Sequence, residues 1–297
     1  MGSRPPVAVV VPFRGSLPER DGLRARLRSL QLAEGDSLVV VDNTPGHSPA
    51  DGPVPVLAAA GHPSPGYARN RGAKRGQAEW LLFFDSDVVP RADLLERYFD
   101  PPPGERTALV GGGVVDEVVA PDAPTAARYA HIRGLMGQDN TFSWGEWAFA
   151  QTSNALCRRE AFEAAGGFRE DIRAGEDADL AYRLKAAGWR LERREGASVV
   201  HLSRSTMRDF VGQQMLHGAG GAWLDRHYPG SVPRKRWPGL VWWSVRVAAV
   251  GLVGAARRRD RDAAIVAVLE PLENIAYELG RSRSNERPPG RRSPART

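Results

Sequence analysis

Short apolar runs that end in acidic side chains are the feature of this 297-residue chain that most limits its fold. Residues 7–11, 38–41 and 80–84 are continuous apolar runs, a pattern typical of strands that are buried on both faces. Shorter runs at 54–57, 108–110 and 198–200 add candidate strands, and helical spacing occurs at 19–32, 67–78, 91–99, 159–165 and 176–187. Strands that alternate with helices predict an α/β fold with a mostly parallel sheet flanked by helices.

The C-terminal third has a different pattern. Helices are expected over 206–227, with doubt near the glycines from 218 to 221, and over 262–280, where Pro271 should kink the helix. We therefore expect an α/β domain over 1–228, a helical extension over 229–280, and a disordered tail rich in Arg, Ser and Pro over 281–297.

Positive charge is concentrated in this C-terminal region. The whole chain holds 41 Lys and Arg against 35 Asp and Glu, but 14 of the basic and only 6 of the acidic residues lie from Arg234 onward. The remaining body is slightly acidic, which argues against a nucleic-acid partner. A basic C-terminal region is compatible with an anionic membrane surface or another polyanion.

Residues 239–256 form an 18-residue apolar stretch that contains one charge, Arg246, and is followed by three arginines at 257–259. The stretch is a helix packed on the body, an interfacial helix, or a membrane span. A span is disfavoured because Arg246 would lie near the bilayer centre, at a cost of about 2.5–3.5 kcal/mol. The aromatic residues that would lie at headgroup level are Trp237, Trp242 and Trp243.

A cytoplasmic location is expected, either in solution or peripheral at the inner face of the cell membrane. Residues 1–6 contain no apolar core of the length that a signal peptide needs. The single cysteine, Cys157, excludes an intramolecular disulfide and a cysteine-only zinc site, so the fold needs no oxidising compartment.

Asp85 and Asp87 flank Ser86 directly after the apolar run 80–84. Two carboxylates at the end of a buried strand repel each other unless a cation lies between them. Mg²⁺ and Mn²⁺ prefer such oxygen ligands and also bind diphosphates. The alternative is a pair of solvated loop aspartates, the second of which caps the next helix.

Two further polar residues follow predicted strands. Asp42 comes after the run 38–41, where its carboxylate can accept an N–H from a pyrimidine or guanine base or simply form a turn. His201 follows the run 198–200 and either ligates a metal through a neutral imidazole or bonds to the backbone.

Glu176 and Asp177 open a predicted helix after Gly175. The helix dipole should lower the pKa of a carboxyl at this position, so that it stays ionised at neutral pH and can accept a proton. The alternative is ordinary acidic decoration of a helix start.

Six segments occur in a fixed order along the chain: VAVVVPFRG, VVVDN, GYARNRGAKRGQAEWLLFFDSD, SNALCRREAFEAAGGF, GEDADLAYRLKAAGW and VVHLSRS. This order resembles the inverting family-2 glycosyltransferases with the GT-A fold, over roughly residues 7–215. The resemblance implies a nucleotide-diphosphate sugar donor and a divalent metal, Mn²⁺ or Mg²⁺.

The resemblance also assigns roles by position. Asp177 matches the catalytic base, with Glu176 beside it. Asp87 matches the metal ligand that bridges to the diphosphate, with His201 and Asp85 as further metal residues. The residues that match nucleotide-sugar contacts are Pro12, Arg14, Asp42, Arg69, Asn70, Asp85 and Ser86.

The implied reaction transfers one sugar with inversion. No Gln-x-x-Arg-Trp motif follows His201, which favours single transfer over polymer synthesis. Asp42 suits uracil, so a UDP-sugar is favoured, although thymine and guanine also donate an N–H. A lipid carrier, a glycan, a peptide and a small metabolite all stay open as acceptor.

Two other functions compete with sugar transfer. One is a catalytically silent module of the same fold that binds a nucleotide sugar or a glycan. The other is a nucleotidyltransferase, which would need a glycine-rich phosphate loop that residues 11–15 match poorly. The aromatic residues that pack in the core or stack on an acceptor sugar are Trp144, Trp147 and Phe149.

Overall fold

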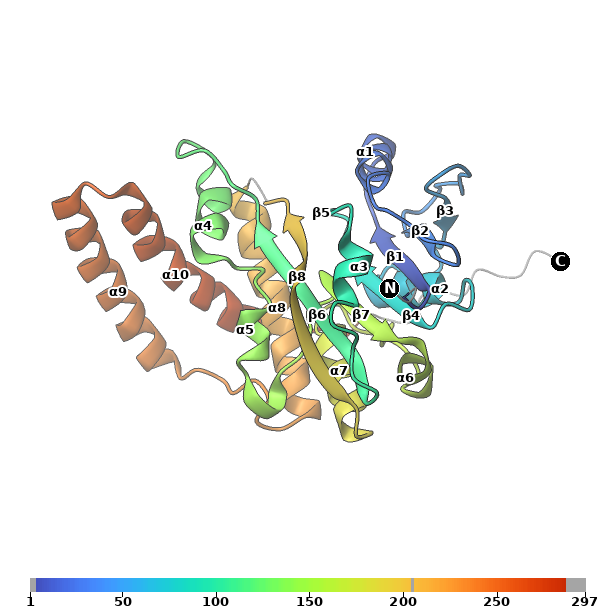
Figure 1. Cartoon of the computed structure of the whole chain (residues 1–297). Helices are drawn as coiled ribbons and strands as arrows, with labels where there is room; N and C mark the ends of the chain where they lie inside the picture. Colours follow the sequence, from blue (N-terminus) through green and yellow to red (C-terminus); the bar gives the residue numbers. More distant parts are fainter. Residues whose placement is uncertain (1–3, 204–205, 287–297) are drawn as a thin grey trace. The chain divides into compact units, whose positions relative to one another are not determined.

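The apolar runs form strands of one eight-stranded sheet with the order β3-β2-β1-β4-β7-β6-β8-β5 (Figure 1). This architecture comes from a computed structural model that describes residues 4–203 and 206–286. The strands are β1 Val7–Phe13, β2 Ser37–Asp42, β3 Val56–Ala58, β4 Trp80–Phe84, β5 Val88–Pro90, β6 Thr107–Asp116, β7 Asn154–Arg158 and β8 Arg190–His201.

The sheet is mixed. Strands β3, β2, β1 and β4 are parallel, in the register that pairs Val10 with Val39 and Phe13 with Asp42. Strand β7 is antiparallel to both β4 and β6. The predicted α/β fold is thus confirmed, and its parallel part consists of β3, β2, β1 and β4. Strand β7 is an antiparallel strand that the sequence pattern did not indicate.

The helices that follow and separate the strands largely match the predicted positions. They are α1 Leu17–Leu27, α2 Pro65–Ala73, α3 Leu94–Tyr98, α4 Thr125–Arg133, α5 Asp139–Phe142, the 3-10 turn η1 Gly145–Trp147, α6 Arg159–Ala164, α7 Glu176–Ala186, α8 Met207–His227, α9 Trp237–Arg258 and α10 Arg261–Gly280.

The described chain divides into two compact units. The first contains the residues up to Val114 together with Thr141–Val199, and the second contains Val115–Asn140 and Val200–Asn285. The tail that was expected to be disordered, 281–297, lies outside the described residues from 287 onward.

Local chemistry explains where α2 begins and ends. Ser64 caps it by accepting the backbone N–H of Tyr67 at 3.0 Å, and Pro65 follows at the first helical position. The helix ends at Ala73, not at residue 78 as predicted, because Gly76 takes a positive φ of 72° and turns the chain. A Cβ on Gly72 would lie 2.3 Å from Val10 Cγ1, so glycine allows α2 to pack closely on β1.

Strands β6 and β8 extend well beyond the predicted 108–110 and 198–200. Strand β6 continues through the glycines at 111–113. At Gly112 and Gly113 neighbouring groups fill the space that a side chain would take. A Cβ on Gly112 would lie 2.3 Å from both Asn154 Nδ2 and Tyr98 Oη. Strand β8 begins in a charged segment without alternating apolar residues, so its first half has no strand pattern.

In the second unit, α8 is continuous through the glycines that made its prediction doubtful. A Cβ on Gly218 would lie 1.9 Å from the backbone oxygen of Tyr277 in α10, and one on Gly221 would lie 2.0 Å from the Tyr277 hydroxyl. The glycines therefore serve close packing of α8 on α10. The second unit also has a core of its own, which contains Ala126, Tyr129, Phe210, Ile265 and Leu269.

Candidate active site

Polar side chains gather at the carboxyl ends of the parallel strands in the first unit. Asp42 is the last residue of β2, and Asp85 comes directly after β4. Strand β1 lies between them in the sheet, and the Asn43 N–H donates to the Phe13 carbonyl at 2.8 Å. Ligands of open α/β sheets bind at this edge, so these side chains lie where a ligand site is expected.

Asp42 is completely buried, and groups of the chain surround its carboxylate. Oδ2 accepts from Arg20 Nη1 at 3.1 Å and lies 2.9 Å from His47 Nδ1, while Oδ1 accepts the Thr44 N–H at 2.9 Å. Burial by itself would raise the pKa of Asp42, but the hydrogen bonds from Thr44, His47 and Arg20 outweigh it and lower the pKa. Asp42 is thus an ionised residue that organises the β2 end of the site.

Arg69 is the residue that joins three elements into one site. Its side chain is buried in α2 and donates from Nη2 to Asp85 Oδ1 at 2.6 Å and from Nη1 to Glu176 Oε1 at 2.7 Å. The guanidinium also lies over the Phe168 ring, 5.5 Å from its centroid. Burial opposes its charge, but the Asp85 and Glu176 carboxylates raise the pKa of Arg69 above its usual range. A permanently charged guanidinium therefore holds two carboxylates from distant parts of the sequence.

Asp177 follows Glu176 in the first turn of α7, and Gly175 caps this helix with a φ of 86°. Burial and the neighbouring Glu176 carboxylate raise the pKa of Asp177 to about 7, although the Ala178 N–H and Arg69 act in the opposite direction. The expectation that the helix dipole would lower this pKa is wrong, because burial and like charge outweigh the helix terminus. A carboxyl that titrates near neutrality is suited to accept a proton.

The other residues assigned by position lie around this centre. Pro12 is half-buried near the end of β1, and Arg14 is exposed in the loop that follows. The Ser86 carbonyl accepts from Arg26 Nη2 at 2.8 Å, and Asp87 is partly exposed just before β5.

Asn70 has a positioning role that the sequence did not indicate. Its Nδ2 donates to the Phe168 carbonyl and to Glu170 Oε1, both at 2.8 Å, and its Oδ1 accepts the Phe168 N–H at 2.9 Å. It thereby ties the loop before α7 to α2, next to Arg69.

His201 belongs to the second unit, at the end of β8. The side chain is buried, and Nδ1 lies 3.1 Å from Asp116 Oδ1 at the end of β6. A carboxylate on one ring nitrogen fixes the orientation of an imidazole, so Nε2 is the nitrogen through which His201 would bind a metal. The structure does not bring His201 together with Asp85 and Asp87 in one unit.

Sequence reasoning missed three residues of these networks. Arg20 and His47 reach Asp42 only through the tertiary fold, and no local motif indicates either of them. Asp116 could have been found, because it follows an apolar strand as Asp42 and Asp85 do.

Aromatic residues of the segment after α5 pack near α7. Trp147 lies 5.1 Å from Tyr182 and Trp144 lies 5.7 Å from Phe149, both edge to face. Lys185 donates from Nζ to the Ala148 carbonyl at 2.7 Å, which holds this segment on the helix that carries Asp177. Trp144 is 40% exposed, whereas Phe149 is buried. Phe149 is therefore explained by packing in the interior, one of its two predicted roles. The ring of Trp144 is partly exposed to solvent, as stacking on a sugar would require.

The oxygen ligands that Asp85 and Asp87 provide suit a divalent cation. Asp85 and Asp87 provide carboxylate oxygens, the ligands that Mn²⁺ and Mg²⁺ prefer. Within residues 4–203 and 206–286, His, Cys, Asp and Glu form no group of three or more that could hold a metal by themselves. Further ligands would thus have to come from a diphosphate or from water.

A mixed α/β sheet whose parallel strands β2 and β4 lead into the carboxylates of Asp42 and Asp85, with a near-neutral carboxyl at the start of α7, is similar to the GT-A fold. The model of glycosyl transferase family group 2 matches residues 80–269. The chain belongs to this family.

Three relatives illustrate the match. The pre-mycofactocin glycosyltransferase of Mycobacterium tuberculosis is 30% identical over 236 residues, which is 75% of this chain and 48% of that protein. The glycosyltransferase AglE of Haloferax volcanii is 31% identical over 125 residues, which is 42% of this chain and 40% of that protein. The chain thus spans about half the length, or less, of these relatives.

The third is the solved structure of the mannosyltransferase PcManGT from Pyrobaculum calidifontis, in complex with GDP-Man and Mn²⁺. It matches with a TM-score of 0.63 and 16% identity over 94% of this chain and 88% of that one. At this identity the likeness shows the fold.

Proposed function

We propose that this chain transfers one sugar from a nucleoside-diphosphate sugar to an acceptor hydroxyl, with inversion at the anomeric carbon. The observation that carries the proposal is the group formed by Arg69, Asp85 and Glu176 beside Asp177, whose pKa is raised to about 7. Family membership supplies the reaction class, and this group supplies a base with a suitable pKa.

Asp177 is proposed to act as the general base. It takes the proton of the acceptor hydroxyl while that oxygen attacks the anomeric carbon and the bond from this carbon to the diphosphate oxygen breaks. The nucleoside diphosphate leaves with the bonding electron pair, and one displacement inverts the configuration. Glu176, sequestered by Arg69, is proposed as a positioning residue whose negative charge keeps the pKa of Asp177 high.

Asp85 and Asp87 would hold the divalent cation, together with oxygens of the diphosphate or of water. When bound, the cation neutralises negative charge on the diphosphate. Arg69 binds Asp85 through Oδ1, and the Asp85 side chain is 33% exposed. Asp85 can therefore bind a cation while it keeps its hydrogen bond to Arg69.

The nucleobase is proposed to lie at the β2 end of the site, near Asp42 and Arg14. Uracil is the base favoured by the sequence, while the PcManGT structure of the same fold contains GDP-Man. The first experiment is therefore a thermal unfolding assay with UDP, dTDP and GDP, each with and without Mn²⁺. Binding to the folded state raises the unfolding temperature, and 100-fold excess over the dissociation constant adds about 2.7 kcal/mol.

We expect one nucleotide to stabilise the protein in a Mn²⁺-dependent manner. Asp87→Ala should abolish this shift, whereas Asp51→Ala, which removes an exposed aspartate elsewhere in the first unit, should retain it. Asp177→Asn should retain the shift and lower turnover by roughly 10²–10⁴-fold. If no nucleotide shifts the folded protein, the chain is a silent member of the fold, and if Asp177→Asn loses the shift, Asp177 is a binding residue and not the base.

A further inference from the structure

Helix α9 exposes an apolar face that the described residues of the chain leave uncovered. The large side chains on this face are 50–67% exposed: Val241, Trp242, Val245, Val250 and Val253. Among the described residues, α9 is the one helix long and apolar enough to cross a membrane by length and composition. We propose that α9 lies flat on an anionic lipid bilayer, and that a basic hollow at its start receives a phosphate headgroup.

The opposite face of α9 is packed on α10. Leu240, Ser244 and Ala255 are buried on this side. A Cβ on Gly251 would lie 2.6 Å from Ala267 Cβ, so the two helices approach very closely. One side of α9 therefore belongs to the protein and the other is open.

Helix α10 in turn is held by charged groups of α4. Arg128 donates to both oxygens of Asp262, with the Nε bond at 2.9 Å, and Arg133 lies 3.2 Å from Glu270. If α9 crossed a bilayer, α10 and these ion pairs would enter the hydrocarbon with it, at a large desolvation cost. The packing on α10 therefore favours a helix that lies in the interface over one that spans the membrane.

Basic residues occur at both ends of α9. Residues 234–236 precede it as Arg-Lys-Arg, and 257–259 end it as Arg-Arg-Arg. On the exposed face, the Arg246 guanidinium lies over the Trp242 ring, 5.3 Å from its centroid. An arginine with a long apolar stem can reach the headgroup layer while its neighbours enter the acyl boundary.

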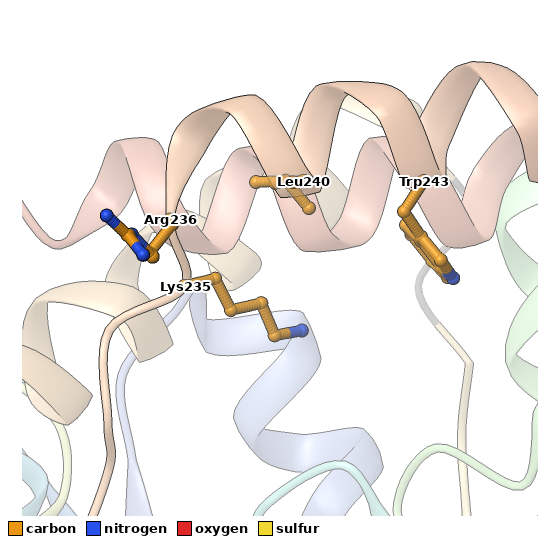
Figure 2. A pocket seen from close by; sticks show the side chains of 5 residues that line it. Lys235, Arg236, Leu240 and Trp243 are labelled. Carbon is orange, nitrogen blue, oxygen red and sulfur yellow. The ribbon is translucent and has the colours of Figure 1, made fainter.

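The hollow at the start of α9 has a volume of about 380 Å³ and is lined by Lys235, Arg236, Gly239, Leu240 and Trp243. In Figure 2, Lys235 and Trp243 project to the same side of the helix, and Arg236 lies at its start. The nearby acid Glu278 is buried and lies 3.7 Å from Arg281, so it offsets little of this positive charge. Two cations, an indole and a leucine suit a phosphate with an apolar chain attached.

Charge also decides between a bilayer and a second copy of the chain as the occupant of this face. Because both ends of α9 are basic, a second α9 in either orientation would place like charges opposite each other. An anionic lipid surface neutralises both ends at once.

The test is flotation of the intact chain with vesicles of pure phosphatidylcholine or of phosphatidylcholine and phosphatidylglycerol at 7:3. We expect binding to the anionic vesicles that 0.5 M NaCl weakens by at least tenfold. The triple variant with Gln at 257–259 should lose on the order of a hundredfold in affinity. Trp242→Ser with Val245→Ser should lose about tenfold on the same vesicles.

Matched variants separate this surface from general charge and apolarity. Val118→Ser removes an 87% exposed valine outside α9, and a triple variant with Gln at Arg28, Lys74 and Arg75 removes three exposed charges in the first unit. Both should bind like the parent chain. Arg236→Gln should weaken anionic binding without affecting the residual binding to pure phosphatidylcholine.

The proposal would be overturned if the folded protein did not bind anionic vesicles, or if the matched control variants lost as much affinity as the α9 variants. It would also be overturned if the protein stayed in the membranes of expressing cells after alkaline carbonate extraction, because such retention indicates a membrane span. Self-association that Trp242→Ser abolishes in the absence of vesicles would replace the bilayer with a second copy. Flotation reads no catalysis and needs no nucleotide, so failure of the proposed transfer reaction would leave this test intact.

Discussion

Asp177 should destabilise the folded protein as the pH rises, and Asp177→Asn should remove that effect. The pKa of this carboxyl is raised from 3.8 to about 7 in the folded state. The folded state therefore binds the proton more tightly than the unfolded state does. The resulting stabilisation is fully present below pH 3.8 and is lost as the pH rises through about 7.

The magnitude follows from the difference between the two pKa values. The raised pKa corresponds to a loss of about 4 kcal/mol of folding stability when the proton is fully lost. Because the Asp177 side chain is partly exposed, the actual loss should be smaller. The free energy of unfolding of Asp177→Asn, minus that of the parent chain, should therefore increase by about 2–3 kcal/mol from pH 4.5 to pH 8. Groups that do not interact with Asp177 titrate alike in both proteins and cancel in the comparison.

The assay is urea unfolding of both proteins in metal-free buffer at pH 4.5 and pH 8. Asp171→Asn, which replaces an exposed aspartate before α7, is the control and should differ from the parent by the same amount at both pH values. A pH-independent difference for Asp177→Asn would refute the raised pKa. The same pKa predicts that kcat/KM of the parent rises with pH and levels off above about 7.

Three other variants or measurements test the packing and the charge network. Gly218→Ala should lower the free energy of unfolding by about 1–3 kcal/mol because its Cβ would meet the Tyr277 backbone at 1.9 Å. Gly212→Ala, in the same helix but with open space around the new Cβ, should raise the free energy of unfolding by up to about 1 kcal/mol. Equal melting temperatures of the two variants would contradict the close packing of α8 on α10. Arg69→Met should cost about 3–5 kcal/mol in urea unfolding and move the pH–rate profile to higher pH, since the buried Glu176 and the half-buried Asp85 lose their cation; an unchanged profile would exclude its role. The Cys157 thiol, buried and with its pKa raised by burial, should react with a thiol reagent only after unfolding, and rapid labelling of the native protein would show local opening of β7.

The sequence by itself determined the strands of the parallel half and the residues at their ends. Continuous apolar runs can be buried only between two covered faces, so β1, β2 and β4 were predicted close to their observed bounds. Asp42 and Asp85 follow two of these predicted strands, and the carboxyl ends of parallel strands lie at one edge of a sheet. This much depends on local hydrophobic pattern, which a sequence contains.

The tertiary structure decided the strands without such a pattern. Strand β7 is short, and the first half of β8 is charged, so their pairing depends on neighbouring strands and not on their own residues. The continuity of α8 likewise follows from contacts, since its glycines are favourable only against Tyr277 of α10.

The tertiary structure also decided the electrostatics of the site. The motif at 176–177 indicated a helix start, and the helix dipole predicted a lowered pKa for Asp177. Arg69, Asp85 and Glu176 are separated by up to 107 residues in sequence, and only folding brings them together. A pKa depends on burial and on charges within a few ångströms, and neither is set by neighbours in the sequence, so the direction of the Asp177 shift could be obtained only from the folded chain.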